Sequence, residues 1–151
     1  RVLLIIDDFT RSCPGMAVSS SLPAKRVTRF LDEIAYISGY PERIRVDNGP
    51  EFISQDFNSW ARKRGIEIQY IRPGKPTDNS FIESFNGKLR NECLNEHWFM
   101  SIQESRRVIE AWRIEYNSYR PHSSLGNATP DEFTGKHMVM LNSKTLALKM
   151  A

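Results

Sequence analysis

The sequence predicts an α/β protein in which a mixed sheet is flanked by helices. Two observations predict this class. An apolar run at residues 2–6 and a second strand pattern at residues 15–19 lie close enough to form an antiparallel hairpin. Two later strand patterns each follow a helical pattern, and strands separated by helices favour parallel neighbours. The 151 residues have the length of one domain.

The first third of the chain alternates between strand and helix patterns. Residues 2–6 are apolar and stop at Asp7, as a buried strand does. Pro23 fits the first turn of a helix, and Gly39 is placed to end it. Between them, apolar residues recur at helical spacing: Val27, Phe30, Leu31 and Ile34. Residues 44–46 follow as a short strand.

The middle of the chain repeats this alternation. Residues 47–50 are typical of a turn into a helix, which Gly65 ends. The buried stripe of that helix is expected to be Ile53, Phe57, Trp60 and Ala61. Residues 66–70 alternate between apolar and polar, as in a half-buried strand, and residues 72–79 are rich in turn formers.

The second half is predicted to be mostly helical. Helices are expected to begin near Ser80 and near Ser101. Trp60 and Trp112 fall on helical apolar stripes, so we expect them in the core rather than stacked on bases. No periodicity indicates a position for the residues beyond Phe133.

Positive charge is concentrated in one segment of the chain. The sequence has 21 basic and 18 acidic side chains, a net charge of +3. Residues 62–90 hold seven basic and three acidic residues, a net of +4, so the whole excess lies there. Dense basic charge suits a phosphate backbone, although a surface that is basic by chance is an open alternative.

Composition and motifs exclude several classes of protein. No apolar run approaches the ~20 residues that span a bilayer, so we expect no membrane association. Cys13 and Cys93 are too few for a disulfide scaffold or a zinc finger, and we expect both to be reduced. The three histidines lack metal-ligand spacing. No glycine-rich phosphate loop and no G-x-S-x-G turn occur, so neither a nucleotide cofactor nor a hydrolase triad is expected.

Two carboxylates are placed where α/β proteins carry out chemistry. Asp47 directly follows the strand at residues 44–46, and ligands of such sheets bind at the carboxyl ends of strands. Glu83 falls in the first turn of the helix that begins near Ser80, on a polar face that it shares with Arg90. A carboxylate and a guanidinium on one exposed face suit a metal ion together with a phosphate.

Each acidic candidate also has a purely structural interpretation. Ser80 and Glu83 have the spacing of a capping box, in which Glu83 would only close the start of its helix. Asp47 fits a turn at a helix entry. Asp7 and Asp8 end a strand too, and they fit turn or edge positions equally well. From the residues alone these alternatives stay open.

Four segments of the sequence have a recognisable combination of motifs: residues 6–11 (IDDFTR), 46–52 (VDNGPEF), 78–93 (DNSFIESFNGKLRNEC) and 116–133, which includes RPHSSLG. Together they resemble the catalytic core of bacterial insertion-sequence transposases, which have an integrase-type DDE core. Asp47 and Glu83 are separated by 35 residues, the spacing that gives this DDE class its name. The resemblance covers about residues 1–135.

The resemblance implies a ribonuclease-H-like fold with a five-stranded mixed sheet. It implies DNA strand cleavage and joining, by attack of water or a DNA 3′-hydroxyl on a phosphodiester, with two Mg²⁺ or Mn²⁺ ions. Asp47 and Glu83 would be the catalytic residues and metal ligands. Arg90 matches a basic position beside the DNA end, whereas Lys75 and Lys88 are candidates for DNA contact on charge alone.

One part of the family pattern is not found in this sequence. In relatives the first catalytic aspartate lies on the first strand, which is central in the sheet. Residues 2–6 of this sequence resemble the second strand of the family. We therefore expect residues 1–135 to be an N-terminally incomplete core whose hairpin has lost a neighbour, with residues 136–151 as a tail. Asp7 and Asp8 match a different family position. Such a core is expected to bind metal weakly, which leaves its activity open.

The sequence is therefore interpreted as the core of a DDE-type polynucleotidyl transferase. Its expected partners are DNA, both transposon ends and target, and further copies of itself, in the bacterial cytoplasm near the nucleoid. A non-catalytic DNA-binding or assembly module with a degenerate core is an alternative from a different class. A nuclease on the same fold is a third possibility, and the signature at residues 116–133 argues against it.

Overall fold

The described residues form a mixed sheet, as the sequence predicts, and it contains five strands. The computed structural model describes residues 1–72, 74–137 and 145–151. The strand order is β2-β1-β5-β3-β4. β1 pairs antiparallel with β2 and β5, whereas β3 pairs parallel with β4 and β5. The strands are β1 (Val2–Asp7), β2 (Met16–Val18), β3 (Arg43–Val46), β4 (Glu67–Tyr70) and β5 (Thr145–Met150).

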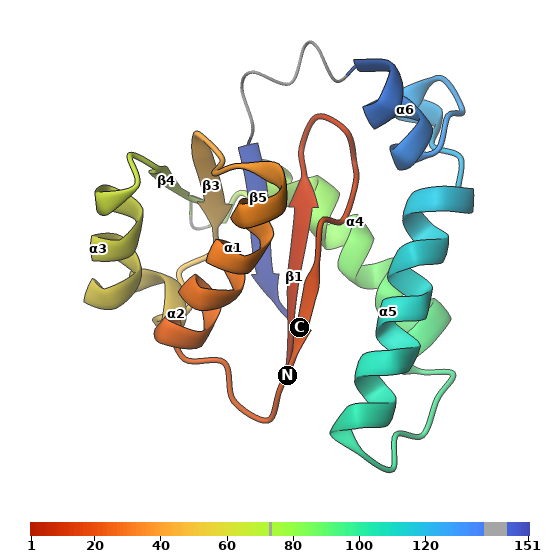
Figure 1. Ribbon diagram of the computed structural model, residues 1–151, viewed down its shortest axis with the longest axis horizontal. Helices are drawn as coiled ribbons and strands as arrows, with labels where there is room; N and C mark the ends of the chain where they lie inside the picture. Colours follow the sequence, from red (N-terminus) through yellow and green to blue (C-terminus); the bar gives the residue numbers. More distant parts are fainter. Residues whose placement is uncertain (73, 138–144) are drawn as a thin grey trace.

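Helices cover both faces of the sheet (Figure 1). One layer consists of α1 (Ala24–Ser38), α2 (Pro50–Ile53) and α3 (Gln55–Lys63). The other consists of α4 (Ser80–Leu89) and α5 (Ile102–Tyr119), and α6 (Pro130–His137) packs on α5. A π-helical turn, Arg90–Leu94, extends α4. Single 3₁₀ turns occupy Pro76–Asn79 and Ser123–Leu125.

Alternating strand residues divide the core between these two layers. Leu3, Ile5 and Leu148 pack against α1, α2 and α3, whereas Leu4 and Ala147 pack against α4 and α5. Trp60 belongs to the first cluster and Trp112 to the second, which confirms their predicted place in the core. The cysteine thiols are likewise buried and unpaired.

The helix expected after residues 47–50 is divided in two. Ser54 has an extended backbone between α2 and α3, and its hydroxyl accepts a hydrogen bond from the Phe57 N–H at 3.2 Å. This serine is the N-cap of α3, which a continuous helix would not allow. Because of this break, α2 does not continue the apolar face of α3. Ile53 is 55% exposed, so its predicted burial was wrong.

The place beside β1 that was expected to be empty is filled by β5. Leu148 pairs with Ile5 of β1 on one side and with Val46 of β3 on the other. Leu146, Ala147 and Leu148 are between 0 and 2% exposed. The expectation of a sheet with a missing neighbour was therefore wrong, because residues for which no periodicity was found supply a central strand.

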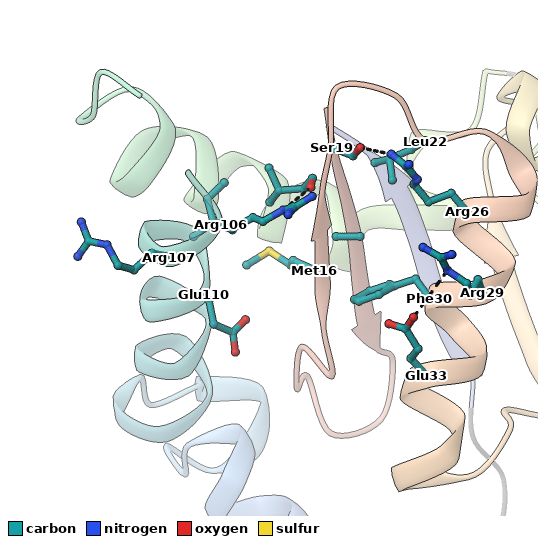
Figure 2. A pocket seen from close by; sticks show the side chains of 13 residues that line it. Met16, Ser19, Leu22, Arg26, Arg29, Phe30, Glu33, Arg106, Arg107 and Glu110 are labelled. Atoms are coloured by element: carbon teal, nitrogen blue, oxygen red, sulfur yellow. Dashed lines mark hydrogen bonds and ion pairs between the residues drawn. The ribbon is translucent and has the colours of Figure 1, made fainter. Parts of the chain in front are cut away.

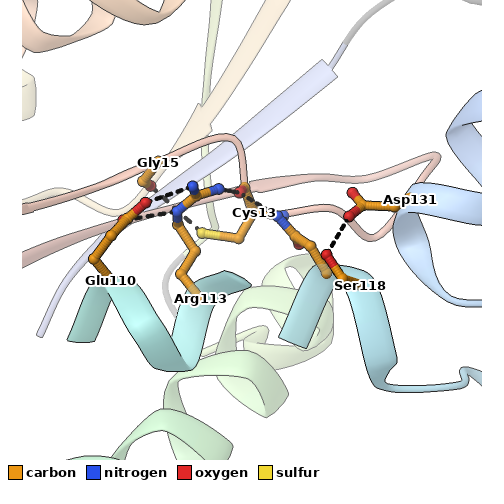
Figure 3. A network of polar contacts seen from close by, with 7 residues as sticks. Cys13, Gly15, Glu110, Arg113, Ser118 and Asp131 are labelled. Carbon is orange, nitrogen blue, oxygen red and sulfur yellow. Dashed lines mark hydrogen bonds and ion pairs between the residues drawn. The ribbon is translucent and has the colours of Figure 1, made fainter. Parts of the chain in front are cut away.

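A polar network ties the connection between β1 and β2 to α5 (Figure 3). The Cys13 N–H donates to Asn117 Oδ1, and Asn117 Nδ2 donates to the Cys13 carbonyl, both at 2.9 Å. Arg113 donates to the same carbonyl at 2.8 Å and forms an ion pair with Glu110. These bonds pair the buried backbone groups of Cys13, which lies in the loop between β1 and β2. They therefore fix the β1–β2 edge of the sheet against α5.

Candidate active site

Asp47 lies at the carboxyl end of β3, directly after Val46. Its Oδ1 accepts a hydrogen bond from the Gly49 N–H at 2.9 Å, in a turn that leads into α2. A Cβ atom on Gly49 would lie 2.8 Å from Glu51 Oε1 and 2.9 Å from Asp47 Oδ1. Glycine therefore permits a close approach of backbone and carboxylate that a larger residue would hinder.

Glu83 lies in the first turn of α4, and it is not a helix cap. The N-cap position of α4 is Asn79, which makes no side-chain capping bond. The only hydrogen bond of the Glu83 carboxylate among the described residues is to Lys149. By contrast, the matching sequence pattern at α5 does cap, because Ser101 Oγ accepts from the Glu104 N–H at 3.0 Å. The capping-box interpretation of Glu83 was therefore wrong.

Lys149 on β5 forms an ion pair with Glu83 and follows Leu148, the partner of Val46 in the sheet. Leu148 is directly opposite Val46 in the parallel pair of β5 and β3, so Lys149 is level with Asp47. Its side chain points to the opposite face from Leu148, toward α4, because strand residues alternate. There the ammonium lies 2.6 Å from Glu83 Oε1, with the side chains 20% and 44% exposed. Lys149 is therefore bound to Glu83 and is the β5 residue level with Asp47 in the strand register.

Asp7 and Asp8 lie toward the other end of the sheet. Leu4 is opposite Lys149, and Asp7 is three residues further along β1, about 10 Å away. Asp7 Oδ1 accepts from the backbone of Phe9 and Thr10, so this residue is part of a turn. Asp8 forms an ion pair with Arg45 at 2.6 Å, and burial raises the pKa of its carboxyl group. Neither aspartate can act as a third ligand beside Asp47.

The three predicted DNA-contacting residues are separate from this ion pair. Lys75 and Arg90 are exposed, in the loop before α4 and at its end, and Lys88 is half-buried. None of their side chains makes a hydrogen bond or a salt bridge with another described residue. Their charges are thus available to an anion, in contrast to Arg72, which forms an ion pair with Asp78 at 2.8 Å.

A large groove lies away from these carboxylates. It has a volume of about 600 Å³ and runs between α1 and α5 over β2. Figure 2 shows Arg29 beside Glu33 on α1, and Arg106 reaching from α5 to the backbone of β2. Arg106 Nε donates to the Val18 carbonyl at 2.9 Å, so it satisfies part of the free edge of the sheet. Neither Asp47 nor Glu83 lines this groove.

The carboxylates do not form a site for two divalent ions in this arrangement. Such ions need several oxygen ligands directed to one point. Across residues 1–72, 74–137 and 145–151, no three acidic, histidine or cysteine side chains are grouped so that they could hold a metal. The Glu83 carboxylate is held by Lys149. The β5 residue level with Asp47 is this same lysine, so that position has an ammonium group where a metal site would need a carboxylate.

Sequence reasoning missed Lys149 and the surroundings of His122. Lys149 could not be found because β5 is recognised only by its pairing with β1 and β3. His122 is 9% exposed, and its ring lies edge-on to that of Tyr116, with centroids 5.1 Å apart. The spacing of the histidines gave no signal, because the groups around His122 come from three separate segments of the chain.

The fold and the strand-end carboxylate define an integrase-type core. A family model described as "Integrase core domain" matches residues 1–76, and a second with the same description matches residues 64–130. The chain belongs to this family, in the group of bacterial insertion-element transposases. No helix within the described residues is long and apolar enough to cross a membrane.

Proteins of insertion elements are similar to the chain over most of its length. It is 49% identical over 137 residues to the insertion element IS476 uncharacterized 39.2 kDa protein of Xanthomonas euvesicatoria, covering 91% of this chain and 40% of that protein. It is 25% identical to transposase InsF for insertion sequence IS3A of Escherichia coli, covering 89% and 48%. The chain thus spans about half or less of these relatives.

Retroviral integrase cores have the same fold. The catalytic core domain of BIV integrase superposes with a TM-score of 0.71 at 14% identity, covering 92% of this chain and 88% of that core. A chain of the simian T-cell lymphotropic virus intasome superposes with a TM-score of 0.74 at 20% identity, covering 88% and 47%. At these identities the likeness concerns the fold alone.

Proposed function

We propose that this chain is the part of an insertion-element transposase that cleaves and joins DNA strands, with Asp47 and Glu83 as its catalytic residues. One observation carries the proposal. Asp47 follows β3, the neighbouring position on β5 is Lys149, and Lys149 holds Glu83 at 2.6 Å. Asp47 thus lies at the end of β3, where ligands of α/β sheets bind, and the strand next to it carries the lysine that holds Glu83.

The proposed substrate is the DNA backbone. Lys75 lies in the loop before α4, Lys88 on α4 and Arg90 directly after it, all within the segment that carries the net charge of +4. When lysine and arginine side chains without protein partners neutralise DNA phosphates, counterions condensed on the DNA are released, and this release favours binding. Membership of the integrase core family supports DNA as the partner.

Lys149 is proposed to take the place of a third acidic ligand. The family pattern expects an aspartate on a strand beside β1, and the strand beside β1 here is β5. A structure of the HTLV-2 integrase core contains magnesium, and two Mg²⁺ or Mn²⁺ ions are the expected cofactors. A divalent cation at Glu83 must displace the ammonium, so no catalytic step is assigned to a metal with β5 in this position.

Nicking of supercoiled plasmid DNA in the presence of Mn²⁺ tests the catalytic assignment. We expect the Lys149→Asp chain to produce open circles faster than the wild-type chain. Adding Asp47→Asn or Glu83→Gln to Lys149→Asp should abolish this nicking, whereas adding Lys25→Gln, at an exposed position of α1, should not. Undiminished nicking in the Asp47→Asn or Glu83→Gln combination would contradict the assignment.

A non-catalytic DNA-binding or assembly module is a second candidate. The ion pair between Lys149 and Glu83 favours it, because that pair neutralises a carboxylate that catalysis requires. This candidate predicts salt-sensitive DNA binding that survives both Asp47→Asn and Glu83→Gln. It also predicts that no variant at Lys149 nicks DNA, so the plasmid experiment separates the two candidates.

A further inference from the structure

We infer that a pocket behind α4, lined by Arg11, Lys88 and His122, binds a phosphate group of the DNA backbone. The inference rests on the proposed function for the source of the phosphate. The pocket has a volume of about 240 Å³ and is bounded by the segment after β1, by α4 and by the chain that follows α5. This volume is below the range of sites for drug-sized organic ligands and suits one small anionic group.

The charged side chains of this pocket are all cationic. Arg11 and Lys88 line it, and no aspartate or glutamate does. The side chain of Lys88 makes no hydrogen bond or salt bridge within the part of the chain that the structure describes. An ammonium without a partner in a concave site attracts anions, and phosphate is the anion that basic pockets of nucleic-acid enzymes meet.

Arg11 is held rigidly in the pocket wall. Its backbone has φ of +59°, a left-handed conformation that is unfavourable for a residue other than glycine. Its N–H bonds to the Asp7 carbonyl at 2.9 Å, one guanidinium nitrogen donates to the Asp8 carbonyl, and the guanidinium stacks on Phe81 at 3.3 Å from the ring centroid. Its buried Nε has no partner among the described residues. The side chain is therefore fixed before any ligand binds.

His122 supplies a second buried group that lacks a partner. The residue is 9% exposed, and its Nε2 has no hydrogen-bond partner among the residues described. Buried polar atoms are nearly always paired, so an unpaired one at a pocket indicates a ligand. Burial and the nearby charges of Lys88, Arg120 and Arg11 lower the pKa of the imidazole, and a bound anion would offset those charges.

Hydroxyl groups complete the set of donors. Ser84, Ser123 and Ser124 line the pocket, and their hydroxyls make no hydrogen bond with the described part of the chain. Ser84 and Lys88 are four residues apart on α4, so they lie on one face of the helix. Ser84 also follows Glu83 directly. A DNA phosphate held here would therefore lie against the same helix turn that presents the catalytic glutamate.

Inorganic phosphate titrated into the full chain tests the pocket directly. In NMR spectra we expect the His122 ring signals to shift with phosphate, and Lys88→Gln should weaken this binding about tenfold. Lys25→Gln removes an exposed lysine of α1, and it is the charge-matched control that should leave the affinity unchanged. Unchanged phosphate affinity in Lys88→Gln would overturn the inference.

Binding of a fluorescent 20-base-pair duplex, measured at several salt concentrations, identifies the source of the phosphate. Lys88→Gln should weaken duplex binding, and it should reduce the slope of log K against log salt concentration by about 1. Lys25→Gln should change neither the affinity nor the slope. If Lys88→Gln weakens binding of inorganic phosphate but not of DNA, the DNA assignment is overturned. The plasmid experiment does not depend on this result, so failure of the proposed function is recognised separately.

Discussion

Replacing Lys149 should open the carboxylate site to a divalent cation. The ammonium lies 2.6 Å from Glu83 Oε1, and the two side chains are 20% and 44% exposed. A partly exposed ion pair of this kind is worth about 1 kcal/mol. A cation that binds Glu83 in the wild-type chain must break this pair, so Lys149→Gln should bind Mn²⁺ about fivefold more tightly.

Lys149→Asp should have a larger effect than Lys149→Gln. It removes the ammonium and adds a carboxylate on β5, level with Asp47. Hard divalent cations bind oxygen ligands, so the added acid supplies what the described residues lack. The expected order of Mn²⁺ affinity is Lys149→Asp, then Lys149→Gln, then the wild-type chain.

Calorimetry or the Mn²⁺ electron paramagnetic resonance signal measures these affinities. Glu83→Gln in the Lys149→Asp chain should remove the gain, and Lys25→Gln controls for the loss of one positive charge. Thermal unfolding should show that Lys149→Gln is folded, since losing the pair costs about 1 kcal/mol. If neither variant at Lys149 binds Mn²⁺ more tightly than the wild-type chain, the ammonium does not compete with a metal.

Three further predictions concern stability and reactivity. Leu148→Ala should lower the free energy of unfolding by about 2–5 kcal/mol in urea titrations, because this side chain is 0% exposed between β1 and β3. A loss below about 1 kcal/mol would show that β5 is not a central strand. Burial raises the pKa of the Cys13 thiol to about 12, so iodoacetamide at pH 8 should label it only after unfolding, and rapid labelling of the native chain would refute this. The pKa of His122 is lowered from 6.5, so the unfolded chain binds a proton more readily. Its contribution to stability is present above about pH 6.5 and is lost as the pH falls below it, and His122→Gln should reduce this loss in urea titrations at pH 7.5 and 5.5.

Most elements could be predicted because their patterns are local. The strands β1 to β4 and the helix α1 were found from apolar runs, alternation and helical spacing. The pattern failed at Ser54, where a capping serine divides a helix and exposes Ile53. It also gave no indication of α6, whose apolar stripe is weak because the helix has only eight residues.

The strand β5 could not be predicted from a local pattern. Half-buried strands alternate between apolar and polar residues, but Leu146, Ala147 and Leu148 are buried on both faces and do not alternate. A short apolar run has no preferred conformation without partners. Only its pairing with β1 and β3 makes it a strand, and that pairing joins residues more than a hundred positions apart.

The sequence by itself determined the family, the α/β class and the two acidic candidates, because motifs and periodicity are properties of neighbouring residues. It predicted Asp47 at a strand end and Glu83 in a helix turn, and both are found there. The tertiary structure decided what lies between them. Strand register put Lys149 beside Asp47, and packing of α4 on the sheet brought Glu83 to its ammonium. Such contacts depend on how distant segments pair, which no local pattern encodes.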